Sequence, residues 1–140
     1  WYPDGESLLY ASRMKSASQR FSQLYRTSRN GGHPERLPLA YAEHAALSGD
    51  GEQLVFQTLT REFRTWKRYR GGMAPDLWMI DFTTGESRRL TDDDANDSLP
   101  MLHRDTVYFL SDRDRRKRAN LWALDLAGGD PRRDGYAVAF

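Results

Sequence analysis

Residues 76–91 read DLWMIDFTTGESRRLT, and this stretch decides the fold. An apolar run of strand-forming residues leads into Thr-Thr-Gly and then into a short basic run. Apolar, β-branched and aromatic runs separated by a glycine turn are typical of a β-hairpin. The same order recurs at residues 23–39 (QLYRTS, then NGGHPERLPL) and at residues 120–135 (NLWALDLAGGDPRRDG). The sequence therefore predicts three copies of one strand–turn–strand unit.

Another strand precedes each copy, namely LLYAS at residues 8–12, LVFQT at 54–58 and VYFLS at 107–111. Further candidate strands lie between the units, YAEHAALS at 41–48 and SLPML at 98–102. Each unit thus offers up to four strands, and long helical periodicity is missing.

Asp-Gly turns lead into the first two of these strands, in the related forms PDGESLLY and GDGEQLVF. The two Asp-Gly pairs begin at positions 4 and 50, which are 46 residues apart. Asp-Gly favours type I′ hairpin turns, whose two central positions both need positive φ. The third unit has LHRDTVYF at residues 102–109 instead, so we expect a different hairpin there.

Four antiparallel strands that recur with a period of this length are typical of β-propeller blades. We therefore expect an all-β fold made of four-stranded antiparallel blades of a partial β-propeller, with units at about 1–42, 43–96 and 97–140. An antiparallel sandwich is the alternative, but it gives no reason for the repeated turn and strand chemistry. Three units cannot close a ring, and open strand edges are an aggregation hazard. We expect an internal piece of a longer polypeptide, or a chain that pairs its edges with a neighbouring copy.

Composition narrows the function classes. The chain has 140 residues, 39% hydrophobic and 29% charged, which suits a soluble globular protein. It has no cysteine, so disulfides, thiolate metal sites and cysteine nucleophiles are excluded. A net charge of +1 is too small to indicate that the chain as a whole binds nucleic acid. No apolar run approaches the roughly 20 residues that span a bilayer. We expect neither a nucleic acid nor a membrane as partner.

The repeat resembles a known group of proteins. PDG before an apolar strand, then Leu-Tyr or Leu-Trp with a trailing Asp, then Gly and RLT, resembles the repeat of TolB-type and tricorn-type propellers. WKRYRGG at 66–72 ahead of DLWMID, with VYFLSDRD and NLWALDL further on, is similar to the six-bladed N-terminal propeller of the tricorn protease family. The third unit departs from this pattern by lacking the PDG-like turn.

The resemblance implies a function for the parent protein. Members are large, self-compartmentalising serine peptidases of the S41 type that trim oligopeptides, and their propeller is regarded as a gate or channel wall. The catalytic part would lie beyond Phe140, so this chain is expected to be a non-catalytic scaffold or gate. Implied partners are oligopeptides, the remaining blades and catalytic domains of the parent chain, and further copies in a homo-oligomer. The expected compartment is the cytoplasm, or the periplasm if the parent carries a signal peptide.

Two other functions stay open. One is a TolB-type propeller that acts as a protein-interaction module without a protease. The other is a propeller that precedes an α/β-hydrolase peptidase. The parent reading frame would separate them: a PDZ-like module with an S41 core, an early end after the ring, or a hydrolase nucleophile elbow.

The sequence contains little that indicates a catalytic site, a metal site or a cofactor site. The three histidines are His33, His44 and His103, and no serine lies in a G-x-S-x-G nucleophile elbow. The acidic stretch TDDDANDS at 91–98 fails the EF-hand spacing, so we interpret it as a solvated loop whose side chains cap turns. No catalytic residue, metal site or cofactor is predicted.

The basic stretches have two interpretations. RDRRKR at 113–118 is predicted to be a solubilising hairpin tip. In REFRTWKRYR at 61–70, cationic side chains can bind peptide carboxylates and aromatic rings can add apolar or cation–π contacts. The candidate peptide-contacting residues are Arg64, Trp66, Lys67, Arg68, Tyr69 and Arg70. The favoured interpretation is structural, with aromatics packed between units under the basic stems and Gly71 and Gly72 turning the chain into the next strand.

Overall fold

The computed structural model describes residues 1–16, 21–59 and 69–135, and these form strands, turns and loops without a helix. The candidate positions at 64–68 lie outside the described residues. The strands are β1 (Ser7–Ser12), β2 (Gln23–Ser28), β3 (Glu35–Arg36), β4 (Ala45–Leu47), β5 (Gln53–Gln57), β6 (Leu77–Asp81), β7 (Ser87–Arg89), β8 (Asp97–His103), β9 (Thr106–Ser111), β10 (Asn120–Asp125) and β11 (Arg132–Arg133).

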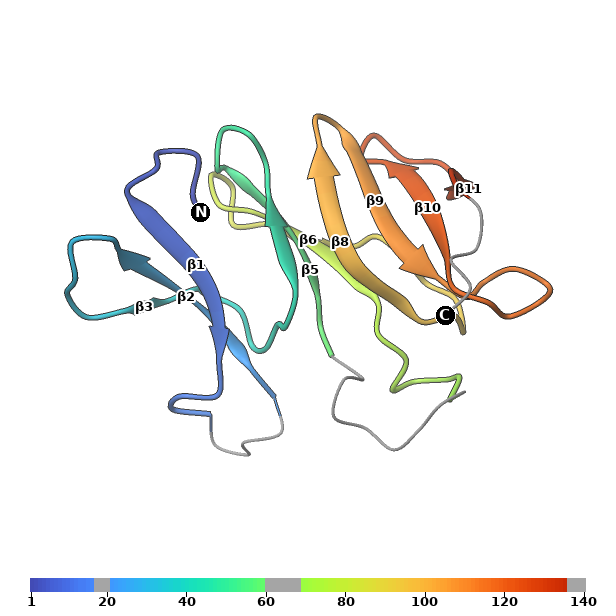
Figure 1. Cartoon of the computed structure of the whole chain (residues 1–140), viewed down its shortest axis with the longest axis horizontal. Helices are drawn as coiled ribbons and strands as arrows, with labels where there is room; N and C mark the ends of the chain where they lie inside the picture. Colours follow the sequence, from blue (N-terminus) through green and yellow to red (C-terminus); the bar gives the residue numbers. More distant parts are fainter. Residues whose placement is uncertain (17–20, 60–68, 136–140) are drawn as a thin grey trace.

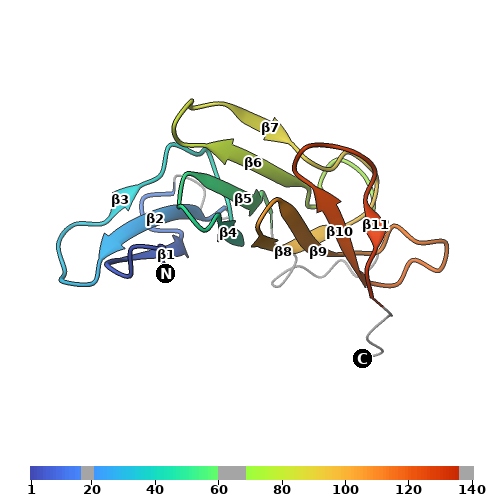
Figure 2. The same ribbon diagram turned by 90° about the horizontal axis from the view of Figure 1, so that it is seen from above.

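The strands form three antiparallel sheets, one after another along the chain (Figure 1). Their orders are β1-β2-β3, β4-β5-β6-β7 and β8-β9-β10-β11. Seen from above, the sheets fan out, with β4 and β8 on the concave side and β3, β7 and β11 on the outside (Figure 2). The predicted all-β, partial-propeller fold is confirmed, except that the described part of the first sheet has three strands rather than four.

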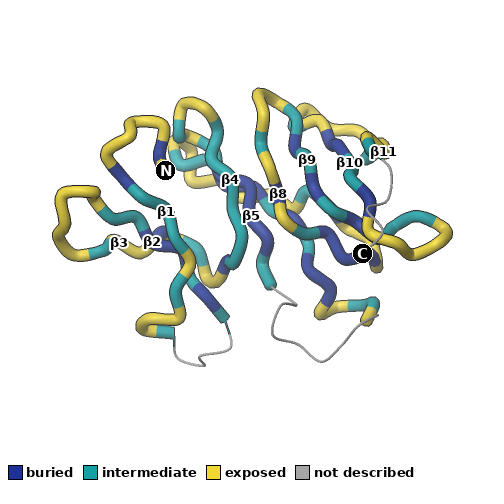
Figure 3. Tube along the Cα trace, viewed as in Figure 1, coloured by how far each residue is buried: buried dark blue, intermediate teal, exposed yellow. Residues whose placement is uncertain are grey.

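Side-chain alternation builds two apolar cores, one on each face of the middle sheet. Figure 3 shows buried residues along β5 of that sheet. On β5, Leu54 and Phe56 face the first sheet, whereas Val55 between them faces the third. All three side chains are buried, as expected for a strand that has neighbours on both faces. β8 packs against β4, β5 and β6, which joins the third sheet to the second.

The two Asp-Gly turns have the same structure, but they are not type I′. Only the glycines have positive φ, 67° at Gly5 and 79° at Gly51. Each closes a four-residue loop by the same bond, from the Tyr2 N–H to the Ser7 carbonyl at 2.8 Å and from Ser48 to Gln53 at 2.9 Å. The aspartate side chain accepts a backbone N–H two residues on, at 2.8 Å in the first loop and 2.9 Å in the second. Each aspartate thus stabilises a four-residue loop with one left-handed glycine instead of the two-residue type I′ turn that the dipeptide predicted.

The third unit has the different hairpin that its sequence predicted. His103 pairs with Thr106, so only two residues connect β8 and β9, and the first of them, Arg104, has φ 53°. Within β8 the register shifts between Ser98 and Met101, and Leu99 has φ 54°. The Leu99 N–H donates to Oε1 of buried Gln57 on β5 at 3.0 Å. A side chain of the second sheet therefore holds the bulge of the third.

Candidate functional site

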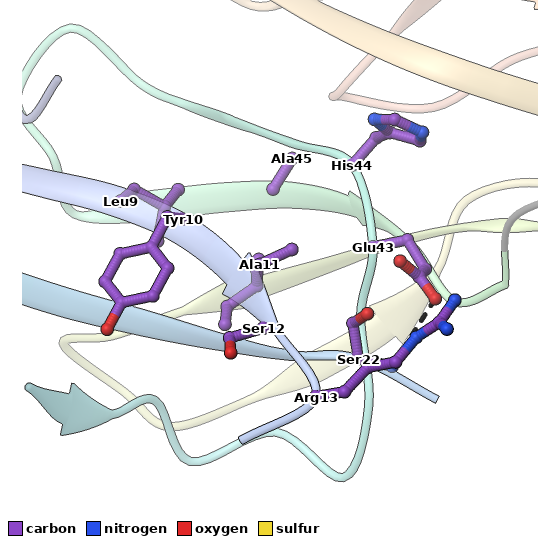
Figure 4. Close-up of a pocket in the computed structure, with 10 residues that line it drawn as sticks. Leu9, Tyr10, Ala11, Ser12, Arg13, Ser22, Glu43, His44 and Ala45 are labelled. Carbon is purple, nitrogen blue, oxygen red and sulfur yellow. Dashed lines mark hydrogen bonds between the residues drawn. The ribbon is translucent and has the colours of Figure 1, made fainter. Parts of the chain in front are cut away.

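A pocket of about 600 Å³ lies on the inner side of the fold, between β1 and the segment that leads into β4 (Figure 4). Its apolar wall comes from Leu9, Leu24 and Ala45, which belong to or pack against the core between the first two sheets. It has room for several side chains. Among the described residues β1 pairs only with β2, and the pocket lies along the other edge of β1.

Polar groups form one end of this pocket. The backbone N–H of Ser22 donates to Oε1 of Glu43 at 3.4 Å, and the Arg13 side chain lies beside this carboxylate (Figure 4). The His44 imidazole points away from the hydroxyls of Ser12 and Ser22. A serine nucleophile needs a base within hydrogen-bond reach and an acid that orients the base. The described residues of this pocket do not show such an arrangement of Ser12, Ser22 and His44.

The other two histidines lie in exposed positions outside the pocket. His33 lies in the exposed Gly-Gly-His-Pro loop, and His103 is exposed at the end of β8. No group of three or more His, Asp or Glu side chains with metal-binding spacing occurs in residues 1–16, 21–59 and 69–135. No helix within these ranges is long and apolar enough to cross a membrane.

The inner strand of the third sheet presents apolar side chains to solvent. Leu99 is 42% exposed and Met101 is 50% exposed, although both lie on a strand. Their neighbour Pro100 is buried, so the strand turns alternate side chains outward. Met101 pairs with Tyr108, so its side chain lies on the face of the third sheet that is turned away from the second sheet.

Of the predicted peptide-contacting residues, the structure describes Tyr69 and Arg70. The Arg70 guanidinium donates to the Asp112 carbonyl at 2.7 Å and lies 3.3 Å from the Asp112 carboxylate. The Tyr69 carbonyl accepts a hydrogen bond from the Asn96 side chain at 3.1 Å. Both residues are thus hydrogen-bonded to loops of the third sheet, the Tyr69 side chain is exposed, and their predicted peptide contacts remain predictions. Gly71 has φ 120°, as expected for a turn into the next strand.

Arg64, Trp66, Lys67 and Arg68 lie outside the described residues, so their predicted peptide contacts remain predictions.

A buried ion pair lies where the sequence predicted only solvated loops. Asp97 is fully buried at the start of β8, and its Oδ2 is 2.6 Å from Nη2 of Arg113. The Arg113 guanidinium lies 5.3 Å from the Phe109 ring centre and 5.4 Å from that of Trp122. Burial raises the pKa of Asp97, opposed by hydrogen bonding to the Ser111 hydroxyl and by the Arg113 charge.

The interpretation of 91–98 as a solvated loop was therefore wrong for Asn96 and Asp97, and that of 113–118 as a solubilising tip was wrong for Arg113. Asp92, Asp93 and Asp94 are exposed, as predicted. One sequence signal was available: Asn96 and Asp97 directly precede the predicted strand at 98–102, where inward-facing positions begin. Because Asn96 also binds both the Asp112 carboxylate and the Tyr69 carbonyl, these loops join the second and third sheets.

Comparison with known proteins agrees with this architecture. Residues 1–135 match the family described as the tricorn protease N-terminal beta propeller domain. The chain belongs to this family. The predicted resemblance is thereby confirmed, and it extends over nearly all of the chain.

Individual relatives in the family are much longer. The chain is 31% identical over 114 residues to a tricorn protease homolog from Saccharolobus solfataricus, covering 81% of this chain and 10% of that protein. It is 30% identical over 131 residues to the tricorn protease of Thermoplasma acidophilum, covering 94% of this chain and 12% of that protein. The chain thus spans about a tenth of the length of these relatives.

Solved structures show the same fold. The structure of TolB from Acinetobacter baumannii matches with a TM-score of 0.70 and 19% identity, over 95% of this chain and 30% of that chain. At this identity the likeness shows the propeller fold and nothing about partners. The two-sided burial of the middle sheet is what such a ring requires of an interior blade.

Proposed function

We propose that this chain is a non-catalytic part of the wall of a tricorn-like serine peptidase, where it acts as a scaffold and gate for oligopeptides. The observation that carries the proposal is the inner side of the fold: an open pocket lies beside β1, and the innermost strand β8 exposes apolar side chains, without a serine–histidine–acid arrangement in the described residues. Extended peptides expose backbone donors and acceptors together with alternating side chains. A wall of strands with apolar positions suits such ligands.

The remaining features of the proposal concern the parent protein. It carries the catalytic part elsewhere in its sequence, assembles as a homo-oligomer, and works in the cytoplasm, or in the periplasm if a signal peptide precedes it. Membership of the tricorn family supports the peptidase assignment. Catalytic residues of the family would lie outside the stretch that this chain covers.

Two measurements on the 140-residue chain test the proposal. We expect no cleavage of fluorogenic oligopeptides and no labelling by a serine-directed fluorophosphonate. A photo-crosslinking residue placed at Met101 should capture added oligopeptides, whereas the same residue at Ser87 on exposed outer strand β7 should not. Turnover that the fluorophosphonate abolishes would contradict the non-catalytic part. Equal capture at both positions would contradict the peptide-facing wall.

A further inference from the structure

Asn30 precedes Gly31 in the loop between β2 and β3, and this is the one Asn-Gly pair in the sequence. Asparagine is a thermolabile residue. The backbone nitrogen of a following glycine can attack its side-chain carbonyl, because glycine has no Cβ to hinder the approach. Hydrogen bonds and burial that fix the side chain slow this reaction, since they must open first. The reactivity of Asn30 therefore depends on how its loop holds it.

The loop leaves the Asn30 side chain exposed and without a partner. Arg29, Asn30, Gly31 and Gly32 are all exposed. The Asn30 side chain makes no hydrogen bond with the residues that the structure describes. Its backbone N–H donates to the Ser28 hydroxyl at 3.1 Å, which holds the main chain but not the amide group. A Cβ added at Gly31 would meet no atom within 4 Å, so the side chain has space to fold back on the Gly31 nitrogen.

The other two asparagines lack this freedom. Asn96 is 8% exposed, and its amide donates to the Asp112 carboxylate at 3.0 Å. Asn120 is 1% exposed, and its amide donates to the Asp114 carboxylate at 3.0 Å. Aspartate follows the first and leucine follows the second, and their side chains hinder the attack. Of the three asparagines, all in the described part of the chain, Asn30 alone is exposed, unbonded at its side chain and followed by glycine.

The Asp-Gly loop of the middle sheet shows how a similar turn holds its side chain. The main-chain bond is the same, from the Gly31 N–H to the Ser28 carbonyl at 3.1 Å and from Gly51 to Ser48 at 3.0 Å. The Asp50 carboxylate, however, accepts the Glu52 N–H at 2.9 Å and the Ser48 hydroxyl.

These two bonds also change the reactivity of Asp50. The Ser48 hydroxyl, and then the Glu52 N–H, lower the pKa of Asp50. The protonated acid, which is the form that loses water to close the ring, is therefore rare. Asn30 has neither restraint, so the two turns share a main chain and differ in the hold on the side chain.

We propose that Asn30 is a modification site at which the chain deamidates spontaneously, with water as the co-reactant and an exposed aspartate or isoaspartate as the product. The Gly31 nitrogen loses its proton and bonds to Cγ of Asn30, and the side-chain nitrogen leaves as ammonia. Water then opens the imide ring. Opening at the α-carbonyl leaves Gly31 attached through the side chain, which gives isoaspartate, and opening at Cγ gives aspartate. This inference does not depend on peptide handling by the chain.

The product places a new negative charge beside an ion pair. Nε of Arg29 lies 3.0 Å from the Glu6 carboxylate, and both side chains are more than half exposed. A carboxylate at position 30 competes with Glu6 for this guanidinium. Isoaspartate also lengthens the main chain between β2 and β3, which pair at only two positions. We expect the modification to loosen this short pairing and to leave buried Leu24 and Leu37 in the core.

Peptide mapping by mass spectrometry tests the site after incubation of the 140-residue chain in mildly alkaline buffer. The peptide with Asn30 should gain the mass difference between an amide and an acid, and the peptides with Asn96 and Asn120 should not. A protein isoaspartyl methyltransferase with labelled S-adenosylmethionine should label the peptide with Asn30. The Asn30→Gln variant should lose both signals, because glutamine would have to close a larger ring. Circular dichroism throughout the incubation reports that the chain stays folded.

The Asp50→Asn variant is the matched control, because it places the same dipeptide in a turn with the same main-chain bond. Its amide oxygen still accepts the Glu52 N–H, so one further hydrogen bond must break before the ring closes. In the folded chain, deamidation at position 50 should be about three- to tenfold slower than at Asn30. In concentrated urea the two positions should react at similar rates.

Three results would overturn the proposal. The first is a reaction at Asn30 that is no faster than at Asn96 and Asn120 in the folded chain. The second is equal deamidation at Asn30 and at position 50 of the folded variant, because the hold on the side chain would then have no effect. The third is a mass gain at Asn30 without methyl labelling, because the imide route yields isoaspartate.

Discussion

The first and middle sheets begin with nearly the same residues, PDGESLLY and GDGEQLVF, yet their surroundings differ. The Asp-Gly loop, the register after it and the strand direction are the same in both. In the middle sheet, Leu54 is fully buried between two sheets, whereas its counterpart Leu8 in the first sheet is half-buried on an outer face. Local structure therefore follows the repeat, and the contribution of each residue to stability follows its neighbours.

Substitution of the paired leucines should give the largest difference between the two sheets. Leu54→Ala should lower the free energy of unfolding by about 2–5 kcal/mol, because it leaves a cavity in a closed core. Leu8→Ala should cost about 1 kcal/mol, because Leu8 already contacts solvent. Urea unfolding followed by tryptophan fluorescence would measure both. Equal losses would mean that the first sheet is covered as fully as the second.

The ion pair of the third sheet should contribute more to the free energy of unfolding than the ion pair of the first sheet. Asp97→Asn should lower the free energy of unfolding by about 3 kcal/mol, because it leaves the largely buried Arg113 guanidinium without its main partner. Arg26→Met breaks the pair with Asp4, which is 2.9 Å long but about 40% exposed on each side. Its effect should be much smaller, because water and salt screen the pair.

Salt titration of both variants sharpens this comparison. Added salt should reduce the effect of Arg26→Met and leave that of Asp97→Asn nearly unchanged. A salt-sensitive Asp97→Asn would contradict the burial that separates the two sites.

Substitutions in the hairpin turns should have smaller effects than Leu54→Ala and Asp97→Asn, and their signs should be opposite. Arg104→Gly should raise the free energy of unfolding by about 0.5–1 kcal/mol, because Arg104 has a left-handed φ of 53° that glycine adopts without strain. Gly5→Ala and Gly51→Ala should each lower it by about 1–2 kcal/mol for the same reason. Thermal unfolding would measure all three. A destabilising Arg104→Gly would show that the arginine side chain, rather than the backbone, determines stability at this turn.

Strand positions and the period of the repeat were predictable because they depend on local chemistry. Residues 76–91 form a strand, a glycine turn and a short basic strand, as their sequence indicates, and the same holds at 120–135. The sequence predicted the Asp-Gly turns at the right positions but with the wrong turn type, because the dipeptide alone does not indicate the hydrogen bond of the aspartate carboxylate. The candidate pocket was not predicted, because it joins β1 to a segment some thirty residues away in the sequence.

The sequence by itself determined the all-β class, the repeated unit and the tricorn family, since each depends on side-chain alternation, turn residues and motif spacing within about fifty residues. Only the tertiary structure decided that Asp97 is buried while Asp92, Asp93 and Asp94 remain in water, and that Arg70 contacts the third sheet. These outcomes depend on which sheet lies against which, and pairing between distant segments fixes that through packing and hydrogen bonds that no short pattern contains.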